Sequence, residues 1–137
     1  MHAGPSLFVA ALLSITTAAC QTGTRLPDEF LGRWYHLETS GGIQGETVQE
    51  RTPGWIVITA ENQIQHHAAN GTLTSTEAFE LSRGSTIFSA EDGWILGTPR
   101  QTNQTLAVTR TIWLAGETLT IADNVYDGFG STYARDR

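Results

Sequence analysis

The sequence predicts an all-β fold, a single antiparallel up-and-down β-barrel of about eight strands. From residue 33 onward, short runs rich in Thr, Val, Ile and aromatic residues alternate with turn residues, as in half-buried strands. No helix-length segment shows a 3.6-residue apolar period. Consecutive strands without crossover helices favour a meander, and closing a meander into a barrel removes its exposed edges. An immunoglobulin-like sandwich is the alternative, but the chain lacks the Cys…Trp…Cys pattern of those domains.

Length and charge limit the possible functions. The chain has 137 residues and a net charge of −6. This length suits one domain, and the charge argues against binding to nucleic acid or to an anionic membrane surface. We expect a monomer without cofactors.

The N-terminal segment predicts export. Residues 7–15 are an apolar run too short to span a bilayer, and small residues follow it up to Ala19. This is the pattern of a signal peptide, which we assign to residues 1–19.

Ala18 and Ala19 before Cys20 resemble the lipobox of bacterial lipoproteins. The resemblance implies that Cys20 carries lipid such as palmitate and anchors the protein to a membrane. Residues 20–26 would be a linker, and residues 27–137 the barrel domain. By the same analogy, Gln21 after the cysteine suggests the periplasmic side of the outer membrane. Cleavage after Ala19 without lipidation is the alternative and would give a secreted or periplasmic protein.

The strands are predicted from alternating polarity and bounding turns. Their expected ranges are 33–39, 54–60, 63–69, 74–82, 85–90, 93–98, 106–114, 117–124 and 131–135. Five dipeptides with hairpin chemistry separate them: Glu61-Asn62, Asn70-Gly71, Arg83-Gly84, Asp92-Gly93 and Ala115-Gly116. The long Gly-containing stretch 40–53 is expected to be a functional loop.

Gly32-x-Trp34 at the start of the first strand and Tyr133-Ala134-Arg135 in the last one resemble the lipocalin-like (calycin) barrels, in particular those of bacterial lipoproteins. The resemblance implies that Trp34 closes one end of the barrel and that Arg135 packs across its ring. The first and last strands must meet for the barrel to close, and a guanidinium over an indole contributes about 0.5–2 kcal/mol.

Strand alternation then suggests which polar side chains face the interior. If Trp34 points inward, so do His36 and Glu38. His66 and Arg110 share faces with apolar residues of later strands. An apolar cavity with a few such groups is typical of a ligand pocket.

Together with Tyr133, these four residues are our candidates for ligand binding. A buried Arg110 needs a partner, either Glu38 or a carboxylate on the ligand. The alternative is a reversed strand, with Trp113 inward and Arg110 in solvent.

Metal binding and catalysis find little support. Adjacent His66 and His67 point to opposite faces of a strand, so we expect no metal site. No nucleophile elbow or zinc-protease motif is present. The segment 123–131 has calcium-loop residues without calcium-loop spacing. It is interpreted as a hairpin whose Asp and Asn side chains bond their own backbone, or as a barrel mouth lined by Tyr126 and Phe129.

The resulting hypothesis is a non-catalytic binding protein of the cell envelope. Its partner would be a small hydrophobic or amphipathic molecule, possibly acidic, held inside the barrel beneath the loop 40–53. The alternative is a periplasmic protein-interaction module, such as a protease or lysozyme inhibitor, with a filled interior.

Overall fold

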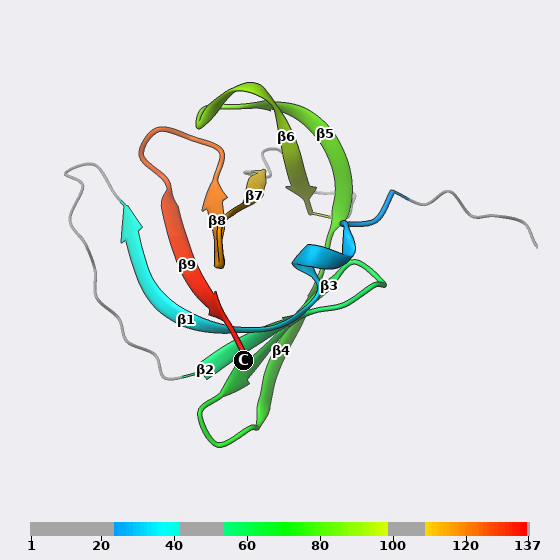
Figure 1. Ribbon diagram of the computed structural model, residues 1–137, viewed down its shortest axis with the longest axis vertical. Coiled ribbons are helices and arrows are strands. Elements are labelled where there is room, and N and C mark those ends of the chain that lie inside the picture. The colour runs from blue at the N-terminus through cyan, green and yellow to red at the C-terminus, as the bar shows by residue number, and fades with distance from the viewer. Residues whose placement is uncertain (1–23, 42–53, 99–108, 137) are drawn as a thin grey trace, which may run out of the picture.

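The computed structural model describes residues 24–41, 54–98 and 109–136, which form one antiparallel β-sheet. Nine strands curl into a half-barrel (Figure 1), so the all-β antiparallel prediction is confirmed. A short 3-10 helix, η1 (Asp28–Phe30), precedes the sheet. The strands are β1 (Gly32–Gly41), β2 (Gly54–Ile58), β3 (Gln63–Ala68), β4 (Leu73–Ala78), β5 (Glu80–Thr86), β6 (Ser89–Gly97), β7 (Arg110–Ala115), β8 (Thr118–Asp123) and β9 (Phe129–Arg135).

The strand order is β4-β3-β2-β1-β9-β8-β7-β6-β5. Every paired neighbour is consecutive in the chain except β1 and β9, so this one pairing brings the first and last strands together. The strands at the two edges, β4 and β5, follow each other in sequence with only Phe79 between them. Phe79 is 5% exposed, and its N–H donates to the carbonyl of Asn62 at 3.0 Å. The predicted single strand 74–82 is therefore broken at a buried aromatic residue.

The β5–β6 hairpin corrects a second prediction. A strand at 85–90 and turns at Arg83-Gly84 and Asp92-Gly93 were expected, but β5 and β6 are continuous there and the turn falls after Thr86. Gly84 and Gly93 are opposite each other in the two strands, and Gly93 leaves room for the Thr86 side chain. The two glycines therefore serve close packing across the strands rather than a turn. The turn itself is held by Asn124, which accepts from the Ile87 N–H at 2.9 Å and donates to the Ser85 carbonyl at 3.2 Å.

The other predicted turns are present. Asn62, Gly71 and Gly116 adopt φ values of 57°, 89° and 63°, the left-handed conformation that Gly and Asn tolerate best. In the segment after β8, the Asp123 carboxylate accepts from the Phe129 N–H at 3.0 Å. This bond agrees with the hairpin interpretation, and Tyr126 is 93% exposed.

The hydrophobic core fills the concave side of the curled sheet near η1. It includes Trp34, Ile58, Leu96, Ile112 and Leu119, each 2% exposed or less. Leu26 is also in the core at 1% exposure, so the folded part includes a residue that was expected in the linker. Within the described ranges, no helix is long or apolar enough to cross a membrane.

Some predictions fall outside the described residues. They are the signal peptide 1–19, Cys20, the first part of the linker, residues 42–53 of the expected functional loop and residues 106–108 of an expected strand. Ser40 and Gly41, which were assigned to that loop, are the last residues of β1.

Candidate functional site

Trp34 fixes one end of the half-barrel. Its ring is fully buried, and its Nε1 donates to the Phe30 carbonyl of η1 at 2.9 Å. Arg135 is directly opposite Trp34 in the β1–β9 register, and its guanidinium lies 4.2 Å from the centre of the indole ring. The same guanidinium donates to the carbonyls of Glu29 and Leu31. The predicted contact of Trp34 with Arg135 thus also holds the short helix against this end of the sheet.

After His36, the alternation of inward and outward side chains along β1 is shifted by one residue. The pairing with β9 slips between His36 and Glu38, so His36 is opposite Tyr133 and Glu38 is opposite Thr132. Such a bulge inserts one extra residue and reverses which later side chains point inward. Glu38 is exposed, and Thr39 takes the inner position instead. The expected inward orientation of Glu38 is therefore wrong.

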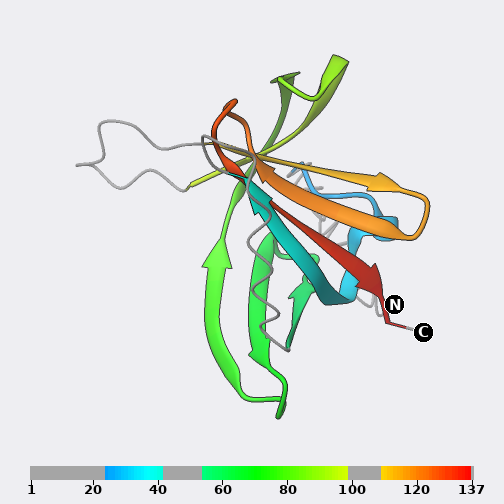
Figure 2. The same ribbon diagram turned by 90° about the vertical axis from the view of Figure 1, so that its left-hand side faces the viewer.

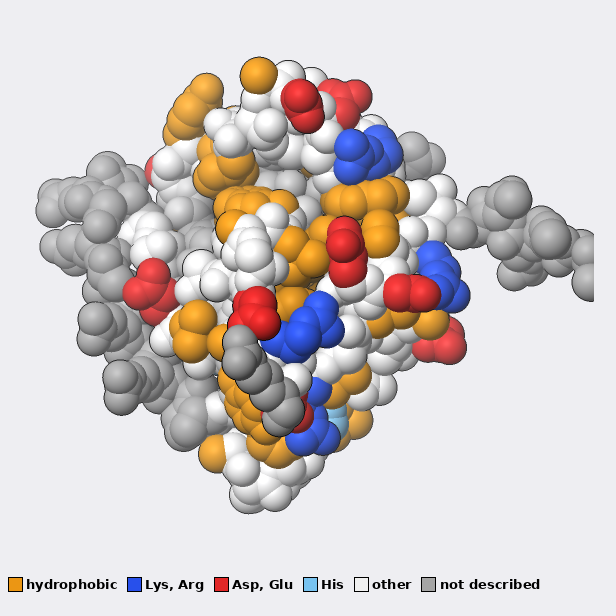
Figure 3. Space-filling view, viewed as in Figure 1, with side chains coloured by type: hydrophobic (Ala, Val, Ile, Leu, Met, Phe, Trp, Pro, Cys, Tyr) orange, Lys and Arg blue, Asp and Glu red, His pale blue; other side chains and the backbone are white. Residues whose placement is uncertain are grey.

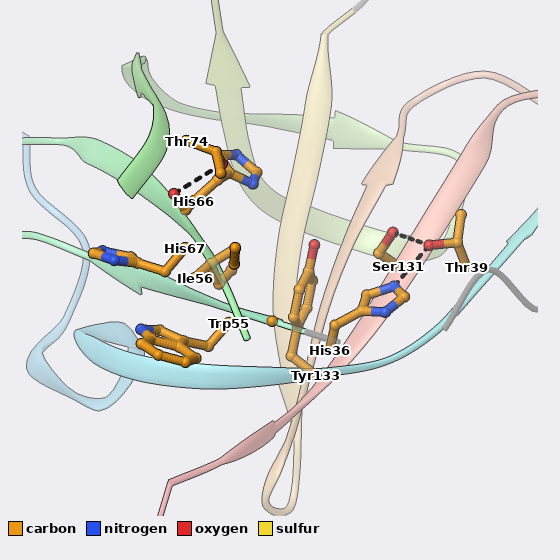
Figure 4. Close-up of a pocket in the computed structure, with 11 residues that line it drawn as sticks. His36, Thr39, Trp55, Ile56, His66, His67, Thr74, Ser131 and Tyr133 are labelled. Carbon is orange, nitrogen blue, oxygen red and sulfur yellow. Dashed lines mark hydrogen bonds between the residues drawn. The ribbon is translucent and has the colours of Figure 1, made fainter. Parts of the chain in front are cut away.

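Beyond the bulge, the concave side holds a groove of about 340 Å³, which we call the histidine groove (Figure 4). Its side chains come from five neighbouring strands of the sheet: β1 and β9 on one side, β2 to β4 on the other. Residues that line it include His36, Thr39, Ile56, His66, Ser131 and Tyr133. Ile56 is buried and supplies an apolar wall, whereas the imidazoles and hydroxyls supply hydrogen-bonding groups.

A chain of hydrogen bonds runs along the β1–β9 side of this groove. His36 Nε2 bonds to Thr39 Oγ1 at 2.8 Å, and Thr39 Oγ1 bonds to Ser131 Oγ at 2.8 Å. The other His36 ring nitrogen, Nδ1, is buried and has no partner among the described residues. An unpaired buried nitrogen of this kind costs stability unless water or a ligand satisfies it.

Tyr133 lines both the histidine groove and a smaller cavity. It is 8% exposed, and its ring meets the His36 ring edge-on with 5.5 Å between centres. Burial raises the pKa of its phenol above the usual 10.0, although a hydrogen bond with Ser131 and the charge of Arg110 act in the opposite direction. The phenol is therefore neutral at physiological pH and able to donate a hydrogen bond.

The smaller cavity has about 180 Å³ and contains Arg110, so we call it the arginine pocket. His66, Ser131 and Tyr133 line both this pocket and the histidine groove, so the two cavities adjoin. Ile112, two residues along β7, is 1% exposed, and Arg110 is half-buried on the same face. The strand therefore has the orientation that places Arg110 toward the concave side.

The partner of Arg110 is Glu77 of β4 rather than Glu38. Glu77 Oε2 accepts from Arg110 Nη1 at 3.3 Å and bonds to His66 Nε2 at 3.1 Å. The hydrogen bond from His66, followed by the charges of Arg110 and His66, lowers the pKa of Glu77 despite the opposing effect of its burial. Glu77 is thus a carboxylate at neutral pH that links β3 to β7 across the curl.

The structure brings four of the five ligand-binding candidates to adjoining cavities: His36, His66, Arg110 and Tyr133. Glu38 is excluded, and the hydrogen-bonding groups of the site also include Thr39, Glu77 and Ser131. The sequence pattern only weakly indicates that these residues face the cavities. Glu77 is in a polar strand, and Thr39 faces inward only because of the bulge.

Chemically, the combined cavities offer imidazole and hydroxyl hydrogen-bonding groups and one compensated cation. Within the described residues, Arg110 hydrogen-bonds through Nη1, so its other guanidinium N–H groups are available to a ligand. Among the described residues, no group of three or more His, Cys, Asp and Glu side chains is arranged to hold a metal ion.

Comparison of the chain with models of protein families, with curated proteins and with solved structures finds no match.

Proposed function

We propose that the protein is a non-catalytic carrier that binds a small, partly apolar, acidic molecule in the histidine groove and the arginine pocket. The observation that carries this proposal is the pair of adjoining cavities, which share Tyr133, His66 and Ser131. The larger one, about 340 Å³, falls within the roughly 300–1,000 Å³ typical of small-molecule sites. A solid interior would instead favour the alternative of a protein-interaction module.

The ligand's apolar part would occupy the groove along Ile56 and the Tyr133 ring. Its carboxylate would be bound by Arg110, with His66 and the Tyr133 hydroxyl as further hydrogen-bonding groups. Because Glu77 already compensates the charge of Arg110, the ligand's charge has to compete with an internal carboxylate. This competition favours moderate affinity and reversible binding.

We further propose that the half-barrel belongs to a closed, lipocalin-like barrel and that Cys20 carries lipid that anchors it in the cell envelope. The β1–β9 pairing, the contact of Trp34 with Arg135 and the direct succession of β4 and β5 support the barrel. The apolar run before Cys20 supports the anchor.

Native mass spectrometry of the protein purified from its own source tests the function directly. We expect a co-purifying molecule of a few hundred daltons that is released on unfolding. The mass of the N-terminal peptide shows at the same time whether the chain begins at a lipid-modified Cys20. A protein that is free of ligand, and that binds neither decanoate nor decanol in calorimetry, would contradict the carrier function.

Substitution at Arg110 tests how the acidic group is bound. Arg110→Gln should weaken decanoate binding about fivefold or more, because a hydrogen bond to a charged group contributes about 1 kcal/mol or more, and it should leave decanol binding nearly unchanged. Arg25→Gln is the matched control, since Arg25 is exposed beside Asp28 and lines neither cavity. Equal decanoate affinity in wild type and Arg110→Gln would exclude Arg110 as the carboxylate-binding residue.

A further inference from the structure

Strands β6 and β7 diverge soon after they meet. They pair only where Trp94, Ile95 and Leu96 are opposite Ile112, Thr111 and Arg110. Strand β6 begins five residues before Trp94, and β7 continues three residues beyond Ile112. The backbone at the free end of the β5–β6 hairpin consequently stands away from that of β7 (Figure 2), and side chains reach across the space between them.

A groove of about 530 Å³ occupies this divergence, and we call it the aromatic groove. Its walls include Phe88 from the hairpin turn and Trp113 from β7, whose ring centres are 5.0 Å apart. The core residues Phe30 and Trp94 also line it. Phe88 is 49% exposed, so a large apolar side chain is available on the surface at this point.

The border of the aromatic groove is acidic. Three exposed carboxylates line it, those of Glu29, Glu91 and Asp92, against a single basic side chain among its described lining residues, Arg83. In the face of the molecule seen in Figure 3, hydrophobic side chains gather near the middle, with acidic and basic side chains around them. An anionic ligand would be repelled by the excess of carboxylates, whereas a cation would be attracted.

Arg83 shows how a cation binds in this groove. Its guanidinium lies 4.6 Å from the centre of the Trp94 ring and donates to the Asp92 carbonyl at 2.7 Å. Aromatic faces attract cations through the negative potential above the ring. The Phe88–Trp113 pair offers further aromatic surface beside the same carboxylates.

We propose that the aromatic groove is a second binding site, specific for a small amphipathic cation, an alkyl chain or ring that carries an ammonium group. The ammonium would lie between the carboxylates of Glu91 and Asp92 and the aromatic rings. The apolar part would pack along Phe88, Trp113 and Phe30. This site shares no lining residue with the histidine groove or the arginine pocket, so the inference does not depend on the proposed carrier function.

Titration of the full chain with decyltrimethylammonium below its critical micelle concentration, followed by calorimetry, tests this proposal. Decyl maltoside provides the same chain with a neutral head group. We expect the cation to bind at least several-fold more tightly than the maltoside, with an affinity that falls as salt is added. Equal affinity for the two head groups, or no binding of the cation, would overturn the proposal.

Two variants of the groove, each with a control, locate the site. Phe88→Ala should weaken cation binding about two- to fivefold, whereas Tyr126→Ala, which removes an aromatic side chain that is 93% exposed outside the groove, should not. The double variant Glu91→Gln/Asp92→Asn should weaken binding by a similar factor and reduce its salt dependence. Glu38→Gln is the control for the loss of an acidic side chain elsewhere. Unchanged binding in both groove variants would place the cation at another site and contradict the assignment.

Discussion

The two halves of the β1–β9 pair differ in what their inner side chains do. At one end, Trp34 is fully buried, its N–H is satisfied by η1 and its ring is covered by Arg135. At the other end, past the bulge, His36 and Thr39 face a groove, and His36 Nδ1 has no partner among the described residues. The β1–β9 pair thus has a packed end that stabilises the fold and a polar end that lines a groove.

The largest expected effect tests the packed end. Trp34→Ala should lower the free energy of unfolding by about 3–5 kcal/mol, because it removes a buried aromatic ring, leaves a cavity and takes away the hydrogen bond to Phe30. Urea unfolding followed by circular dichroism measures the loss. Trp55→Ala is the matched control, since Trp55 is only half-buried on β2, and it should cost less. Equal losses would mean that Trp34 has no special part in stability.

Glu77, which bonds to Arg110 and His66, gives a smaller, pH-dependent effect on the free energy of unfolding. The folded-state pKa of Glu77 is below its ordinary value of 4.5. Its contribution to stability is therefore present above that value and is lost as the pH falls through the lowered folded-state pKa. Glu77→Gln should reduce the free energy of unfolding by up to about 1 kcal/mol at pH 6, because the pair is partly exposed and screened by solvent.

At pH 3 the difference between wild type and Glu77→Gln should shrink. Urea unfolding of both proteins between pH 3 and pH 7 checks this. A difference that is constant over that range would show that the hydrogen bonds of Glu77 matter and its charge does not.

The smallest expected effect belongs to the open end. His36→Leu removes one hydrogen bond to Thr39 and also removes the unpaired buried nitrogen, so the two effects offset each other. We expect a change in unfolding free energy within about 1 kcal/mol, with Thr39 still bonded to Ser131. A loss as large as that of Trp34→Ala would show that the polar end is as important for stability as the packed one.

Much of the fold was predictable because it depends on local chemistry. Alternating polarity marked most of the strands, and Asn62, Gly71 and Gly116 marked turns that require positive φ. The prediction failed at Gly84 and Gly93, because the same residue type that permits a turn also permits close packing between strands. Only the contacts of Asn124 with the hairpin show where the turn falls.

The site was predictable only in part, for a similar reason. Strict alternation from Trp34 places His36 inward correctly, but it fails at Glu38 because the bulge adds one residue to β1. The partner of Arg110 could not be derived, since Glu77 is 33 residues away in the chain and on a strand that does not pair with β7.

The sequence by itself therefore determined the fold class and most strand boundaries, because the strand period and the turn residues are short-range constraints. It also indicated that the first and last strands meet, because a meander that closes has to pair them. The tertiary structure alone decided which polar groups share a cavity and where β6 separates from β7. Those features depend on the curl of the sheet, the bulge in β1 and the short β6–β7 pairing, none of which leaves a periodic trace in the sequence.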